Sequence, residues 1–111
     1  MKMSHEKYIE AQRKRAVEVA CGMLVGSIPY LEGAIELSSL RFEVGVQEND
    51  ADFIAFTAVA SEIDHLPIGS ARQYWEAEAL NRLEPEIQQF TQWAKEFSLS
   101  KCKSIVERFS A

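Results

Sequence analysis

The sequence predicts an all-α fold, in which residues 1–111 form one domain built as a single compact bundle of about five helices. The length of 111 residues, with 47% hydrophobic and 26% charged residues, suits one globular domain with one core. Apolar residues recur at steps of three and four along most of the chain, which is the helical period. Ser, Asp, Gly and Pro residues also stand where helices commonly begin and end.

The first predicted helix starts after Ser4, which can cap it, and runs to about Leu24. A second helix is predicted after Ser27, again as the capping residue. Pro29 then falls in the first turn, where its missing N–H has no partner in any case. Gly45 fits the terminating position of this second helix.

The third predicted helix is capped by Asp50 and continues to Ile63. A strand is the competing interpretation, because the run is rich in aromatic and β-branched residues. We favour a helix because Asp50 and Asp52 lie where the helix dipole stabilises negative charge. Pro67 and Gly69 then end this element.

The last part of the chain is predicted to hold a short helix, a turn and a long helix. Ser70 with Gln73 resembles a capping box that opens the short helix, and residues 77–83 form the turn. Pro85 suits the first turn of the long helix. The phase of the apolar stripe slips near residues 98–100, which predicts a kink or short break. Trp75 and Trp93 follow the helical spacing and are interpreted mainly as core residues, Trp75 being the better candidate for a binding contact.

Negative charge is concentrated in the middle of the chain, whose net charge is −5. Residues 27–86 carry three arginines against twelve acidic residues, a net charge of −9, whereas residues 1–26 and 87–111 each carry +2. Phosphate backbones require the opposite sign, so we expect no nucleic-acid partner. The acidic segment suits a basic protein surface, and the alternative is a solvated surface that only aids solubility.

The chain is expected to be cytoplasmic and to have no membrane partner. Its N-terminus has no apolar signal-peptide core, and the longest stretch without a charged residue spans only thirteen positions, residues 19–31. Cys21 and Cys102 form neither a CxxC pair nor a metal-ligand spacing. We therefore expect two buried free thiols.

One cluster of titratable residues leaves a metal site or acid–base chemistry open. Asp64 and His65 lie two and three residues after Glu62, and Glu32 and Glu36 lie one turn apart on the second predicted helix. In the competing interpretation, Asp64 and His65 only cap the third helix and fix the following loop. The sequence has no GxSxG elbow and no glycine-rich phosphate loop, so we expect neither an enzyme nor a cofactor.

Two stretches resemble a family of small helical bacterial proteins, Ile28–Gly45 and Glu62–Gly69, with Trp75, Glu86 and the closing Cys102–Phe109 continuing the likeness. Members of such families resemble immunity proteins of contact-dependent growth inhibition and related polymorphic toxin systems. The resemblance carries no catalytic residues. It implies a protein that binds and neutralises a cognate toxin.

The predicted function is therefore occlusion of the active site of a basic, nuclease-like toxin domain. Complementary charge would speed capture, and an aromatic anchor would hold the partner. A homodimer joined through apolar faces is a further possibility. The residues predicted to contact the partner are acids near loops with one aromatic anchor: Glu43, Glu48, Asp50, Asp52, Tyr74, Glu76 and Glu78. The alternative metal ligands are Glu32, Glu36, Asp64 and His65.

Overall fold

Helix α1 (His5–Val25) begins as the sequence predicts, in a computed structural model that describes residues 4–110. The backbone N–H of Lys7 donates to the Ser4 hydroxyl oxygen over 3.2 Å, which satisfies one of the free donors of the first turn. Gly26 ends the helix with a φ of 85°, in the left-handed region that favours glycine.

Helix α2 (Tyr30–Leu40) starts later and ends earlier than the sequence predicts. Pro29 occupies the N-cap position, and the Ser27 hydroxyl lies 3.5 Å from the Gly22 carbonyl oxygen instead of capping α2. The predicted Ser27 cap is therefore wrong. The chain continues through turns after Leu40, and Arg13 of α1 donates to the Val44 carbonyl oxygen over 2.7 Å, which holds this segment against α1.

Helix α3 (Ala51–Glu62) confirms the helical interpretation over the strand. The Asp50 carboxylate accepts the Phe53 N–H at 3.4 Å, as expected for an N-cap residue. Phe53, Phe56 and Val59 are completely buried. These three side chains place α3 in the centre of the core.

The remaining elements are the 3-10 helix η1 (Gly69–Tyr74) and the long helix α4 (Ala77–Phe109). A short helix at η1 is confirmed, but no side chain caps it, so the Ser70–Gln73 capping box is wrong. The turn at residues 77–83 and the helix predicted from Pro85 form one element, because Pro85 lies inside α4. Its missing N–H leaves the Asn81 carbonyl without its helical donor.

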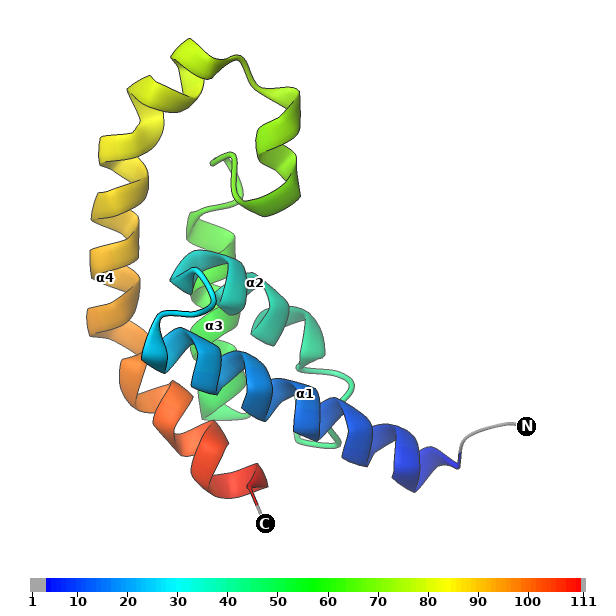
Figure 1. The fold of residues 1–111 in the computed structure, drawn as a ribbon. Helices are drawn as coiled ribbons and strands as arrows, with labels where there is room; N and C mark the ends of the chain where they lie inside the picture. The colour runs from blue at the N-terminus through cyan, green and yellow to red at the C-terminus, as the bar shows by residue number, and fades with distance from the viewer. Residues whose placement is uncertain (1–3, 111) are drawn as a thin grey trace.

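Helix α4 runs without a break through residues 98–100, yet Figure 1 shows it changing direction in this region. The Ser98 hydroxyl donates to the Ala94 carbonyl oxygen over 2.6 Å, and the Thr91 hydroxyl donates to the Ile87 carbonyl oxygen over 2.8 Å. Side-chain bonds of this kind compete for the backbone acceptor and bend helices. The bend thus coincides with the phase slip of the sequence, and the alternative of a break is wrong.

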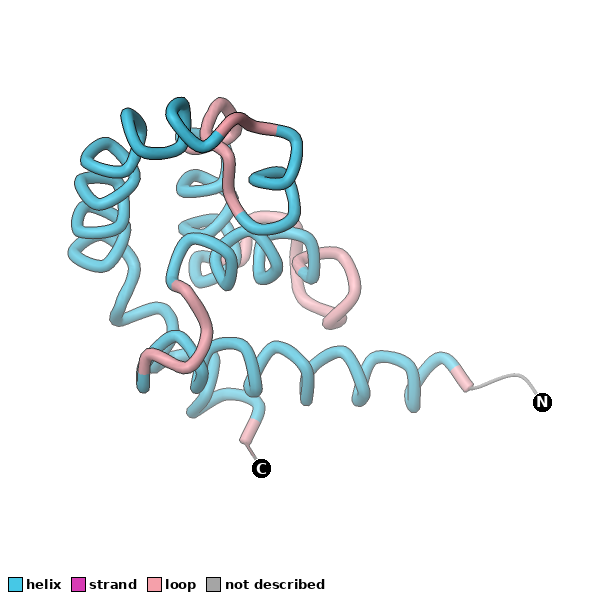
Figure 2. Tube along the Cα trace, turned by 45° about the horizontal axis from the view of Figure 1, so that its top comes forward, coloured by secondary structure: helices cyan, strands magenta, loops and turns pink. Residues whose placement is uncertain are grey.

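The described residues form an all-α bundle without strands, as predicted. Figures 1 and 2 show the arrangement: α4 passes along one side of the molecule, and the first half of α1 extends away from the other helices. Helix α1 packs on α2 and α4, and α3 packs on α2 and α4. Leu37, Ile63 and Ile105 lie completely or almost completely buried between them.

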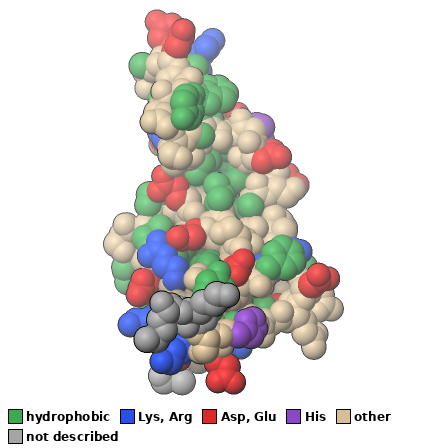
Figure 3. All heavy atoms as spheres, turned by 90° about the vertical axis from the view of Figure 1, so that its right-hand side faces the viewer, with side chains coloured by type: hydrophobic (Ala, Val, Ile, Leu, Met, Phe, Trp, Pro, Cys, Tyr) green, Lys and Arg blue, Asp and Glu red, His purple; other side chains and the backbone are tan. Residues whose placement is uncertain are grey.

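Residues 69–84, which comprise η1 and the first turns of α4, form a projection that we call the arm. Figure 3 shows the arm as the narrow upper part of the molecule, with apolar, acidic and basic side chains on it. No helix within residues 4–110 combines the length and the apolar character that crossing a bilayer requires.

Candidate functional site

The four alternative metal ligands do not assemble into one ligand set. Glu36 is bound by Arg15, whose Nη2 lies 2.9 Å from the Glu36 Oε1 atom. His65 Nε2 lies 3.2 Å from the Glu86 Oε1 atom, across from the end of α3. Among residues 4–110, no group of three or more His, Cys, Asp or Glu side chains is placed to hold a metal ion.

The first predicted partner contacts lie in the segment that links α2 to α3. Glu43 accepts a hydrogen bond of 2.8 Å from the Tyr8 hydroxyl of α1, and this bond raises the pKa of Tyr8. Glu48 is exposed in the following loop. Of these two carboxylates, Glu48 is the more accessible to a partner.

Asp50 and Asp52 are engaged within the molecule by Arg108 at the end of α4. Arg108 makes two hydrogen bonds of 2.8 and 2.9 Å with Asp50, and its Nη1 also lies 2.8 Å from the Asp52 Oδ2 atom. Ser104 donates to the same Asp52 oxygen over 2.6 Å, and Asp52 is only 7% exposed. The hydrogen bonds from Arg108 lower the pKa of Asp50 below its ordinary value. The single positive charge of Arg108 therefore compensates one of the two negative charges of this pair, and both carboxylates are held inside the molecule.

The remaining predicted contacts lie together on the arm. Tyr74 is 84% exposed and stands at the end of η1, directly before the partly exposed Trp75. Glu76 and Glu78 are exposed at the start of α4, and neither takes part in an ion pair within the described part of the chain. The arm thus presents two aromatic rings beside two free carboxylates.

The predicted contacts form two separate groups rather than one acidic face. Asp50 and Asp52 lie beside Arg108 at one end of α4, and Glu78 lies at the other. The 30 residues between Glu78 and Arg108 correspond to about 45 Å of helix. These acids were grouped in the sequence analysis because they are close along the chain, and the fold separates them.

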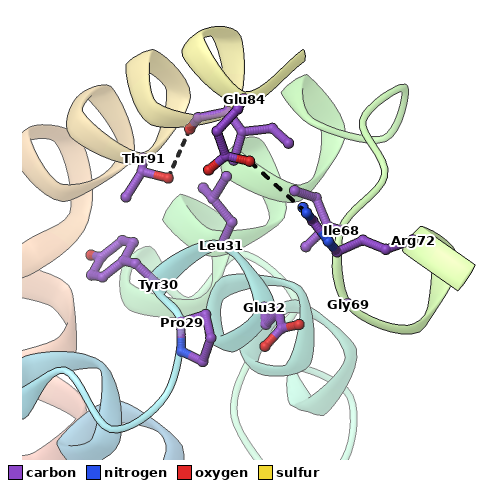
Figure 4. Close-up of a pocket in the computed structure, with 10 residues that line it drawn as sticks. Pro29, Tyr30, Leu31, Glu32, Ile68, Gly69, Arg72, Glu84 and Thr91 are labelled. Atoms are coloured by element: carbon purple, nitrogen blue, oxygen red, sulfur yellow. Dashed lines mark hydrogen bonds and ion pairs between the residues drawn. The ribbon is translucent and has the colours of Figure 1, made fainter. Parts of the chain in front are cut away.

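A cavity of about 460 Å³ lies between the arm and the beginning of α2. Figure 4 shows Arg72 of η1 and Glu84 of α4 pointing toward each other at its edge, where their charged groups are 3.9 Å apart. Leu31, Ile68 and other apolar side chains line it, together with the carboxylate-bearing Glu32. The cavity lies directly beneath the arm that carries the exposed aromatic residues.

Two arginines of the acidic middle segment, Arg41 and Arg72, are engaged within the molecule. Arg72 pairs with Glu84, as described above. Arg41 donates to the Thr57 hydroxyl oxygen over 3.3 Å and lies over the ring of Phe42 at 4.3 Å. The buried Nε of Arg41 has no hydrogen-bond partner among the described residues. The contacts of these two arginines do not indicate a catalytic site.

A buried cluster of polar side chains joins α2 to α4 and includes the thiol of Cys102. The Tyr30 hydroxyl lies 2.7 Å from the Ser98 hydroxyl and 3.8 Å from the Cys102 Sγ atom. Burial raises the pKa of Tyr30, and burial also raises the pKa of Cys102 to about 11. Cys21 and Cys102 are both free thiols, as expected, but Cys21 is partly exposed rather than buried.

The sequence interpretation missed an exposed aromatic row on α4. Trp93 is 36% exposed and Phe97 is 48% exposed, and their rings stack 5.4 Å apart. The sequence contains a signal for this row, which is the width of the apolar stripe on the helix. With Phe90, Trp93 and Phe97 included, the stripe is wider than one buried helix face.

Comparison with known proteins gives no assignment for this chain, since no family model, curated protein or solved structure matches it. The functional argument therefore depends on the accessible groups of the fold. Among the predicted contacts, these are Glu48, Tyr74, Glu76 and Glu78.

Proposed function

We propose that this chain is a cytoplasmic immunity protein that binds a cognate basic toxin domain and occludes its active site. The exposure of Tyr74 supports this proposal most directly, because a large aromatic ring that is 84% exposed contributes nothing to the core. Tyrosine and tryptophan are enriched among the residues that dominate the energy of protein interfaces.

Charge on the arm supports a basic partner. Glu76 and Glu78 lie just after the two rings, and neither forms an ion pair with a cation of the described residues. Arg82 lies one helical turn beyond Glu78, and the arm as a whole carries three acidic residues against two arginines. A toxin that cleaves nucleic acid must have a basic cleft, and carboxylates on a projecting arm can enter such a cleft. Their charge would accelerate association, while Tyr74 would slow dissociation once it is buried.

The test first establishes whether a gene adjacent to this chain's gene encodes a protein with a toxic C-terminal domain. That domain is then produced together with the chain in the same cells. The wild-type chain should restore growth and bind the purified domain. A Tyr74→Ala, Glu76→Lys, Glu78→Lys variant should lose protection and associate about tenfold more slowly or worse at low salt.

The matched control is a Glu10→Lys, Glu107→Lys variant, which makes a similar charge change at exposed positions on α1 and at the end of α4. This control should protect cells as the wild type does. Absence of binding by the wild-type chain would overturn the proposal. Equal loss of binding in both variants would show that only net charge matters, and would overturn the role of the arm.

A further inference from the structure

A row of aromatic rings follows one side of α4, apart from the arm. The Phe90 ring meets the Trp93 ring edge-on at a centroid distance of 6.1 Å, and Trp93 stacks on Phe97 with an interplanar angle of 9°. The His65 ring also meets the Phe90 ring edge-on, with the ring centroids 5.7 Å apart. We call Phe90, Trp93 and Phe97 the aromatic row.

The aromatic row is a surface feature with a shallow cavity beside it. Phe97 is 48% exposed, and a cavity of about 390 Å³ lies against Phe90 and Trp93. Glu62 of α3 and Gln89 of α4 complete its lining. Contiguous exposed rings of this kind mark interaction sites more often than accidental exposure does.

The charges around the aromatic row are mostly acidic. Glu62 lines the cavity itself, and Glu96 lies one helical turn from Trp93, so both carboxylates border the rings. Neither forms an ion pair with a cation of residues 4–110, although Glu96 accepts a hydrogen bond of 2.9 Å from Gln92. Glu86 pairs with His65. The one cation that the helical period places on the same side of α4 near the row is Lys101, which lies one turn beyond Phe97.

The length of the aromatic row matches the spacing of apolar anchor residues on an amphipathic helix. Phe90 and Phe97 are seven residues apart on α4, which is about 10 Å along the axis. An amphipathic helix repeats its apolar anchors at positions i, i+3 or i+4, and i+7, and therefore over the same length. Acidic borders favour lysine or arginine beside those anchors.

We propose that the aromatic row is a second docking surface, which binds a basic amphipathic helix of another protein. The apolar anchors of that helix would cover Phe90, Trp93 and Phe97, and its basic residues would face Glu62 and Glu96. This inference does not require the partner to be a toxin, and it involves none of the arm residues.

The test measures binding of a fluorescein-labelled synthetic 18-residue helix made of leucine and lysine in an amphipathic pattern. A peptide with glutamate in place of lysine is the control for charge. Fluorescence anisotropy should show binding of the lysine peptide and at least about tenfold weaker binding of the glutamate peptide. Equal binding of the two peptides, or no binding, overturns the proposal.

Two variants locate the site. Trp93→Ser with Phe97→Ser should weaken binding of the lysine peptide about tenfold or more, and Glu62→Lys with Glu96→Lys should do so without touching a ring. The matched controls are Ile35→Ser, at an exposed apolar position of α2, and Glu107→Lys, at an exposed acidic position of α4; both should change the Kd less than twofold. Unchanged binding by the charge variant overturns the proposal even if the ring variant fails to fold.

A second copy of the chain is the competing occupant. Sedimentation velocity of the wild-type protein should show a monomer whose size Trp93→Ser does not alter. A dimer that Trp93→Ser dissociates would show that another copy covers the aromatic row, and would overturn docking of a foreign helix. The arm variant should bind the lysine peptide normally, so failure of the arm and failure of the aromatic row are distinguishable.

Discussion

The hydroxyl groups of Tyr30 on α2 and Ser98 on α4 lie 2.7 Å apart in the buried core, where the α4 backbone bends. The Ser98 proton is directed to the Ala94 carbonyl oxygen, so Tyr30 must be the donor of the shared bond. The Ser98 hydroxyl thus takes part both in the bond to Ala94 within α4 and in the bond from Tyr30 that joins α2 to α4.

Removing either hydroxyl should destabilise the fold, by unequal amounts. Tyr30→Phe deletes a donor and should lower the free energy of unfolding by about 1 kcal/mol. Ser98→Ala leaves the buried Tyr30 hydroxyl without a good acceptor and should cost about 2 kcal/mol. Urea denaturation of both single variants and the double variant should show that the double loss is smaller than the sum, because the two share one bond.

The control for this cycle is Tyr74→Phe, which removes a hydroxyl from an exposed ring. Its free energy of unfolding should stay within about 0.5 kcal/mol of the wild type. Strict additivity of Tyr30→Phe and Ser98→Ala would contradict the bond between them.

The contact of Arg108 with Asp50 and Asp52 should make stability depend on acid pH. Arg108 lowers the pKa of Asp50 below its ordinary value of 3.8, so the folded state favours the carboxylate. The stabilisation is complete above about pH 4 and is lost as the pH falls through the folded pKa. Arg108→Met should lower the free energy of unfolding by about 2 kcal/mol at neutral pH and flatten its decline below about pH 4.

Lys103→Met serves as the control for Arg108→Met, since Lys103 is exposed on the same helix and forms no ion pair within residues 4–110. Chemical denaturation at a series of pH values compares the two variants. An equal acid decline in the wild type and Arg108→Met would show that other groups control acid unfolding.

The two cysteines should differ in reactivity toward a thiol reagent. Cys102 is completely buried and has a pKa of about 11, so the thiolate that reacts is scarce and shielded. Cys21 is partly exposed on α1. At pH 8, about one thiol per chain should react quickly with a chromogenic disulfide, and the second should react only in denaturant.

Cys21→Ser should abolish the fast reaction and leave the slow one. Cys102→Ser is the reciprocal variant and should keep the fast reaction. A rapid reaction of native Cys21→Ser would show that the core around Cys102 opens far more readily than its packing indicates.

Local chemistry in the sequence was sufficient to predict the fold class and two helix starts. Ser4 and Asp50 cap helices through bonds to the third residue that follows, so the signal lies within one turn. The single helix α4 was missed because Pro85 suits a first turn, whereas the structure accommodates it inside the helix.

The candidate site was less predictable because its electrostatics depend on distant residues. Asp50 and Arg108 are 58 positions apart, and no periodic pattern connects them. From the sequence, Asp50 and Asp52 were therefore interpreted as free charges, whereas both pair with Arg108. Tyr74 and Glu76 were identified because they lie near a predicted loop, where side chains tend to remain accessible.

Pro85 gives the two ends of α4 different mechanical properties. The turn before it is held by one backbone bond fewer, while the later turns are fixed by the core and by Arg108. Binding of the proposed partner to the arm would therefore bend α4 more readily at this turn than at a fully bonded one. Differences in affinity among related partners should then be largely entropic, since each would order the same small segment to a different degree.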